Sequence, residues 1–371
     1  CNWRIVMTQL RAITEQSQVI VTCGTGGVGK TSVAAALGVV AAQQGRRVVV
    51  VTIDPARRLL DAIGLEDNTG NEIQQVPLDS VGELWVTMLD VRETFDSLVR
   101  DTSPTVERAN EVMQNSFYRS LSKSLSGTRD YMAAERLYNL HNDPRFDLVI
   151  VDTPPSRNAL DFLESPERLA RFLKHPIVRF LVAPSRGGFR IANAAMQPVL
   201  KAISGIVGGD ALTGAAAFLR AFDGMETEFS RRALAVAATL RSDATHFVIV
   251  TAPSTDALTE ADHFVSELSR LRISLQHVVA NRMPPTFGAL TAAEEKEQAR
   301  VTTGDLSTAH SLIAGLCEDA ENAKTGIGAF LERTQVLFPQ LNITYANEMP
   351  ADIHDMESIA ILASQLAVHP S

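Results

Sequence analysis

The chain has 371 residues, of which 45% are hydrophobic and 21% are charged, a composition typical of a soluble globular protein. The net charge of −9 argues against a general nucleic-acid or anionic-membrane binder, because both functions need a basic face. The three cysteines form no CxxC motif, and we find no leader pattern and no uninterrupted apolar run of ~18 residues. We therefore expect a cytoplasmic protein.

Strand-like apolar runs alternate with helical segments from residue 18 onward. An apolar run at 19–23 precedes a glycine-rich turn, an alanine-rich helix over 30–44 and a second apolar run at 47–53. This order is typical of a βαβ unit, whose two strands lie parallel. Further strands are predicted at 84–89, 148–151, 247–251, 278–280 and 343–345, and a further helix at 256–271. The alternation predicts an α/β fold with a mostly parallel sheet of seven or eight strands, flanked by helices.

Two long segments, residues 92–140 and 165–242, are rich in helical patterns and contain no strand candidate. We interpret them as insertions that form a helical subdomain within a single domain spanning residues 1–371. Part of the second insertion, residues 189–221, is rich in glycine, alanine and large apolar side chains. These apolar side chains either pack on one another or form an exposed groove for a partner or hydrophobic client.

The turn after the first apolar run matches the phosphate-loop pattern G-x-x-x-x-G-K-[ST]. The matching residues are Gly24, Thr25, Gly26, Gly27, Val28, Gly29, Lys30 and Thr31, followed by Ser32. Glycines let backbone N–H groups approach phosphate oxygens, and the following helix directs its positive end at the same anion. Lys30 supplies a charge for the β- and γ-phosphates and the Thr31 hydroxyl a ligand for Mg²⁺. The sequence thus predicts a nucleotide-binding site.

Two aspartates directly follow predicted strands. Asp54 comes directly after the run at 47–53, and Asp152 comes directly after the run at 148–151. Ligands of open α/β sheets bind at the carboxyl ends of parallel strands, so both carboxylates are candidates for the same site. The alternative is that each aspartate caps the helix that follows it.

These motifs resemble those of the ArsA-like, anion-transporting ATPase family of P-loop NTPases, in its actinobacterial branch. The family's phosphate loop is matched from Gly24 to Thr31 except at the second position, and its switch I motif D-P-A stands at Asp54-Pro55-Ala56. Its switch II motif is similar to the segment that begins Asp152-Thr153-Pro154-Pro155. The order and spacing of the motifs agree over almost the whole chain.

The resemblance implies an ATPase that binds ATP with Mg²⁺. It assigns Asp54 to the attacking water and Lys30 to the phosphates, so that both are catalytic, and it assigns Thr31 and Asp152 to the metal. By the same resemblance, Asn281 contacts the adenine base. A loop over that base is similar to the segment at 349–353, which contains Pro350.

The chain also departs from the family pattern. The family's signature lysine, which reaches across a dimer to the partner's nucleotide, is Thr25 here, so we expect slow turnover unless a partner or a nearby arginine (Arg57 or Arg58) replaces it. The CxxC that staples some family dimers through zinc is absent. No cysteine cluster is available for arsenite, since Cys23 and Cys317 are far apart in sequence.

The resemblance leaves several functions open. The first is an ATPase, working as a homodimer or as a heterodimer with a paralogous subunit, that handles a hydrophobic or membrane-protein client. The second is a nucleotide-binding regulatory or scaffold subunit with weak hydrolysis, and the third is the energising subunit of an anion exporter. We expect no nucleic-acid partner, because the chain is acidic.

Three further features are expected to be structural. Cys23 is interpreted as a buried residue at a strand end, and His354 as a surface residue of a loop. The acidic run at 294–297 is interpreted as a solvated helix or loop.

Overall fold

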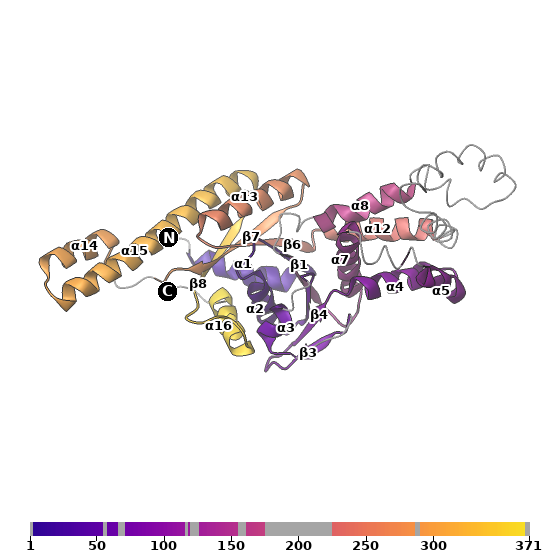
Figure 1. Cartoon of the computed structure of the whole chain (residues 1–371), viewed down its shortest axis with the longest axis horizontal. Helices are drawn as coiled ribbons and strands as arrows, with labels where there is room; N and C mark the ends of the chain where they lie inside the picture. Colours follow the sequence, from indigo (N-terminus) through magenta and orange to yellow (C-terminus); the bar gives the residue numbers. More distant parts are fainter. Residues whose placement is uncertain are drawn as a thin grey trace, which may run out of the picture. The chain divides into compact units, whose positions relative to one another are not determined.

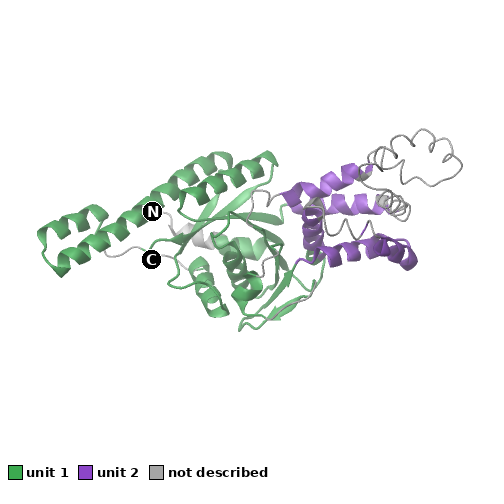
Figure 2. Cartoon of the chain, viewed as in Figure 1, with its two compact units in different colours: residues 1–88, 140–160, 243–371 green, residues 89–139, 161–242 purple. Residues whose placement is uncertain are grey.

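The computed structural model describes residues 3–54, 58–65, 71–115, 118, 126–154, 161–174, 225–285 and 290–367. The chain divides into two compact units, coloured separately in Figure 2. Unit 1 comprises residues 1–88, 140–160 and 243–371, and unit 2 comprises residues 89–139 and 161–242. The segment at 189–221, with its predicted packing surface or client groove, lies outside the described residues.

Unit 1 contains an eight-stranded sheet in the order β3-β4-β2-β5-β1-β6-β7-β8. The strands are β1 (Val19–Cys23), β2 (Arg47–Thr52), β3 (Gln74–Val76), β4 (Glu83–Met88), β5 (Leu148–Asp152), β6 (Thr245–Thr251), β7 (Leu275–Met283) and β8 (Asn342–Asn347). Neighbouring strands are parallel except β3 and β4, which pair antiparallel. The predicted α/β fold with a mostly parallel sheet is confirmed.

The central strands are buried because helices cover both faces of the sheet. Every residue of β1 and β5 is buried, which explains their uninterrupted apolar sequences. On one face, α2 (Lys30–Gln43) packs with α16 (Met356–Ala367), α1 (Trp3–Gln16) and α3 (Arg58–Ile63). On the other face, α13 (Thr255–Arg270) packs on β6 and on α15 (Asp305–Leu337), as Figure 1 shows.

The apolar runs located the strands well but not their ends. β7 extends beyond the predicted run at 278–280 in both directions, because His277 and Asn281 are polar yet buried within the strand. β3 and α1 were not predicted. β3 has only three residues, two of them glutamines, at the edge of the sheet.

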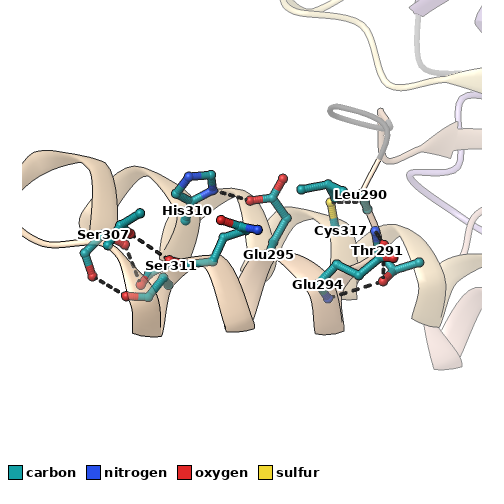
Figure 3. Close-up of polar contacts among 11 residues, drawn as sticks. Leu290, Thr291, Glu294, Glu295, Ser307, His310, Ser311 and Cys317 are labelled. Atoms are coloured by element: carbon teal, nitrogen blue, oxygen red, sulfur yellow. Dashed lines mark hydrogen bonds and ion pairs between the residues drawn. The ribbon is translucent and has the colours of Figure 1, made fainter.

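A helical hairpin joins β7 to β8. It consists of α14 (Ala292–Val301) and the long helix α15. A capping box opens α14, in which Glu294 N–H donates to Thr291 Oγ1 at 3.3 Å and Thr291 N–H to Glu294 Oε2 at 2.8 Å. Figure 3 shows His310 of α15 directed at Glu295 of α14, with 2.6 Å between His310 Nδ1 and Glu295 Oε2.

Residues 294–297 lie in a helix, α14, and the interpretation of them as solvated is wrong at one position. Glu295 is only 4% exposed, because its side chain turns towards α15. Its neighbours Glu294, Lys296 and Glu297 are exposed as expected. This segment of α14 therefore contributes both a solvated face with charges of both signs and one buried glutamate that is hydrogen-bonded to His310.

Unit 2 is helical in the residues that the structure describes. Its helices are α4 (Val91–Thr102), α5 (Val106–Gln114), most of α7 (Ser126–His141), α8 (Asp161–Lys174) and α12 (Glu226–Leu240). α7 and α12 are joined by a buried ion pair, in which Arg232 Nε donates to Glu135 Oε1 at 2.8 Å. Burial raises the pKa of Glu135, and Arg232 opposes this effect.

None of the described helices is long and apolar enough to cross a membrane.

Candidate nucleotide-binding site

The phosphate loop connects β1 to α2 in a conformation that only glycine tolerates at two positions. Gly24 has φ 148°, and a Cβ on it would lie 2.1 Å from the Val250 carbonyl oxygen. Gly29 has φ 85°, and a Cβ there would lie 2.4 Å from Asn281 Nδ2. Both glycines are therefore required for the loop to fit between neighbouring strands.

Lys30 stands at the first turn of α2 and is nearly buried, with 6% of its surface exposed. Its Nζ donates to the carbonyl oxygen of Thr25 at 2.6 Å, so the side chain folds back over the loop. Burial lowers the pKa of Lys30, and the charge of Asp152 opposes this effect. A lysine held in this way places its charge beside the backbone amides that would receive a phosphate.

Asp152 ends β5 and lies between two hydroxyl groups. Thr31 Oγ1 donates to Asp152 Oδ2 at 2.8 Å, and Thr52 Oγ1 donates to the same oxygen at 3.1 Å. The residue is 1% exposed, and burial raises the pKa of its carboxyl group to about 6. The other oxygen, Oδ1, is buried and has no hydrogen-bond partner among the described residues. Since buried polar atoms are normally paired, this oxygen is available to a further ligand.

The Thr31 hydroxyl and the Asp152 carboxylate fit Mg²⁺ by chemistry, because this ion prefers oxygen ligands. Within the described ranges, no cluster of three or more His, Cys, Asp or Glu residues could hold a metal ion by itself. Mg²⁺ in nucleotide sites is usually held by one or two protein groups together with substrate phosphates, and the pair fits this mode of binding.

Asp54 follows β2 and is 7% exposed. Its backbone N–H donates to Thr52 Oγ1 at 3.2 Å, so one threonine connects the segments of both candidate aspartates. Of the nearby arginines that could replace the signature lysine, Arg57 lies outside the described residues, whereas Arg58 opens α3.

A cavity of about 340 Å³ lies beside the loop, within the size range of small-molecule sites. We call it the nucleotide cavity. It is lined by Gly27, Gly29, Lys30, Thr31, Ser32, Asp54, Arg58, Asp61, Ala62, Thr153, Arg282, Ile353 and His354. Three of these side chains are basic at neutral pH, which suits a polyanion.

The two residues assigned to the base differ in position. Asn281, at 5% exposed, donates from Nδ2 to the Val28 carbonyl oxygen at 2.8 Å, so in this structure it holds the phosphate loop. Pro350 is exposed and is not among the residues that line the nucleotide cavity. Ile353 and His354, which follow it, form that part of the lining, so His354 lies closer to the site than expected.

Sequence reasoning missed two residues of this region. Thr52, the last residue of β2, bonds Asp152 and the Asp54 backbone, and its signal is a buried polar residue at a strand's carboxyl end. Arg282, which directly follows Asn281, received no role from the sequence, yet it lines the cavity. Cys23 is fully buried as expected, and burial raises the pKa of its thiol to about 12.

Comparisons with known proteins agree with this geometry. The sequence profile of the anion-transporting ATPase family ArsA matches residues 17–301. The chain is 25% identical over 268 residues to an ATPase ASNA1 homolog of Entamoeba dispar, covering 71% of this chain and 75% of that protein. It is 26% identical over 282 residues to an arsenical pump-driving ATPase of Escherichia coli, covering 74% of this chain but 40% of that protein.

A third relative, an ATPase ASNA1 homolog 1 of Paramecium tetraurelia, is 24% identical over 261 residues, covering 70% of this chain and 73% of that protein. The matched profile spans most of the chain and includes the loop, both aspartates and Asn281. The chain belongs to the ArsA family of anion-transporting ATPases.

Proposed function

We propose that this protein binds ATP with Mg²⁺ on the loop from Gly24 to Ser32 and hydrolyses it. The observation that carries the proposal is Oδ1 of buried Asp152, which has no partner among the described residues. The other oxygen of the same carboxylate accepts from Thr31, and the Asp152 charge opposes the lowering of the Lys30 pKa. Family membership and the lining of the nucleotide cavity support the same reaction.

Each residue of the site has a proposed role that follows from its position. The loop amides and Lys30 hold the β- and γ-phosphates, and Asn281 keeps the loop in its receiving conformation through Val28. Thr31 and Asp152 would hold Mg²⁺, which, when bound, neutralises charge on the phosphates. Asp54, at the cavity wall, orients the attacking water and accepts its proton.

Asp152 and Asp54 also connect the site to the chain segments that follow them. When the γ-phosphate leaves, the contacts made by these two residues change, and the segments after β2 and β5 change with them. We propose that this movement acts on unit 2, whose helix α8 is the next helix in the chain after β5. The client of that movement is proposed to be hydrophobic or membrane-associated.

Thr25 favours a second candidate, a regulatory nucleotide-binding subunit with weak hydrolysis. Its side chain carries no charge for a partner's nucleotide, and such a transferred cation is worth ~10³-fold or more in rate in other nucleotide hydrolases. A dimer, of like or unlike chains, would complete the site if the partner supplies a cation. Turnover per chain should then rise with protein concentration or on addition of a paralogous subunit.

Energising an anion exporter is the weakest candidate. The name of the Escherichia coli relative refers to an arsenical pump. However, the cysteines of the described residues that form no disulfide, Cys23 and Cys317, are both buried, and a buried thiol is a poor arsenite ligand. Cysteines without disulfides fit the reducing cytoplasm, which is the location that we propose for the protein.

The test compares the wild type with Lys30→Ala and Asp54→Asn in ATP binding and steady-state hydrolysis. Lys30→Ala should lose ATP binding, whereas Asp54→Asn should bind ATP but turn over at least ~100-fold more slowly. Lys324→Ala, which removes an exposed lysine of α15, is the matched control and should behave as wild type. Equal hydrolysis in all four proteins would refute the proposed function.

A further inference from the structure

Arg282 has an unusual backbone for its position. Its φ is 56°, in the left-handed region that non-glycine residues rarely adopt, although it stands inside strand β7. The register between β7 and β8 shifts at this point, since Ala280 pairs with Tyr345 and Met283 with Asn347. Asn281 and Arg282 together therefore oppose the single residue Ala346, which is a β-bulge.

The other non-glycine residue with positive φ among the described residues provides a contrast. Arg272 has φ 55° and follows Leu271, the C-cap of α13, where a left-handed residue commonly ends a helix. The end of α13 thus explains the backbone conformation of Arg272. Arg282 has no helix end to explain it, and strained backbone of this kind clusters at functional sites.

The bulge places Arg282 beside the phosphate loop. A second cavity, of about 790 Å³, lies next to Thr25, Gly26, Gly27 and Val28 and extends to the start of α13 and to α15. Of the described residues, Gly27 and Arg282 line both this second cavity and the nucleotide cavity. Asn281, the other bulge residue, bonds the loop at Val28.

The Arg282 side chain also has no polar partner among the described residues. The residue is exposed, and no hydrogen bond or ion pair engages its side chain within the part of the chain that the structure describes. Asp256 and Asp319 line the second cavity too, but neither is paired with it. A guanidinium beside phosphate-binding amides, with no carboxylate attached, is suited to a phosphate oxygen.

We infer that Arg282 contacts the polyphosphate of the bound nucleotide and supplies from the same chain a cation that the loop lacks at Thr25. This inference rests on the proposed function, since it assigns a further residue to the same ligand. The bulge is the device that turns the side chain out of the strand and towards the loop, at the expense of backbone strain.

The experiment measures the Kd for ATP with Mg²⁺ in wild type, Arg282→Gln and Arg282→Lys. A lost charged hydrogen bond should weaken ATP binding by about tenfold or more in Arg282→Gln, while Arg282→Lys, which retains the charge, should stay within about threefold of wild type. Arg272→Gln makes the same chemical change on the same backbone conformation away from the loop, and its Kd should be that of wild type.

A thermal melt separates contact from folding. Glycine relieves positive-φ strain, so Arg282→Gly and Arg272→Gly should both melt no lower than wild type without nucleotide, and only Arg282→Gly should bind ATP more weakly. Unchanged ATP affinity in Arg282→Gln, or equal loss in Arg282→Lys, would overturn the assignment of a charge contact. If Lys30→Ala abolishes ATP binding in the same titration, the proposed function stands whatever the Arg282 variants do. If the wild-type protein binds no ATP, the proposed function and the Arg282 assignment are both refuted.

Discussion

The loop region and the α14–α15 hairpin each bury a carboxylate, but the two carboxylates differ in how completely they are hydrogen-bonded. In the hairpin, Glu295 is paired with His310 of the facing helix. At the end of β5, the described residues supply Asp152 with two donors on one oxygen and none on the other. The first carboxylate is satisfied within the fold, whereas the second is only half satisfied.

The difference separates a folding role from a binding role. A buried charge is costly unless it is paired, so a fold that leaves one oxygen of a buried carboxylate open loses stability in the absence of a ligand. Position matters as well, because the open oxygen lies at the carboxyl end of a parallel strand, where ligands of such sheets bind. The hairpin carboxylate has neither property.

The largest effect is expected for Asp152→Asn. The variant keeps an oxygen for the Thr31 and Thr52 hydroxyls but loses the charge for Mg²⁺, so ATP turnover should fall by about 100-fold or more. Without nucleotide its melting temperature should equal or exceed that of wild type, because an incompletely paired buried charge is gone. A large loss of stability with normal ATP turnover would contradict this prediction, because it would give Asp152 a folding role and not a binding role.

The opposite pattern is expected for Glu295→Ala. Removing the carboxylate leaves His310 without its partner and should destabilise the hairpin by about 2 kcal/mol. Denaturant unfolding and amide exchange of α14 measure this loss, and ATP hydrolysis should be unchanged. Glu297→Ala, an exposed acid on the same helix, is the control and should have little effect on either measurement.

His277 sharpens the comparison, because its Nδ1 is buried without a described partner although it lies near the start of β7, away from the carboxyl ends. Burial lowers the pKa of His277 to about 3, so the ring stays neutral in the folded protein at pH values where the unfolded chain binds a proton, that is, below pH ~6.5. Stability is unaffected at neutral pH and falls as the pH drops, by about 1.4 kcal/mol at pH 5.5. Unfolding titrations of wild type and His277→Gln should differ in this slope. An identical slope would show that the ring is not neutral in the fold.

Much of the fold could be predicted from the sequence, because it depends on local patterns. Buried parallel strands appear as apolar runs, and a phosphate loop needs glycines at fixed spacing. Hence Lys30, Thr31, Asp54 and Asp152 were all identified as candidates. The structure brings them together at the carboxyl ends of the central strands.

The remaining features depend on contacts between distant segments. The burial of Glu295 requires α15 to fold back on α14, which an acidic run cannot indicate. The position of Arg282 at the cavities beside the loop depends on how β7 pairs with β8, and the pattern of polar and apolar residues does not reveal a bulge. Asn281 was assigned to a base, yet its position in the structure depends on the Val28 carbonyl.

The most direct test of the central claim is a calorimetric titration of the wild-type protein with ATP, in the presence of Mg²⁺ and in the presence of a chelator. The open oxygen of Asp152 predicts saturable binding of one ATP per chain that is at least about tenfold tighter with Mg²⁺. No heat of binding in either buffer, or equal affinity in both, would contradict the claim.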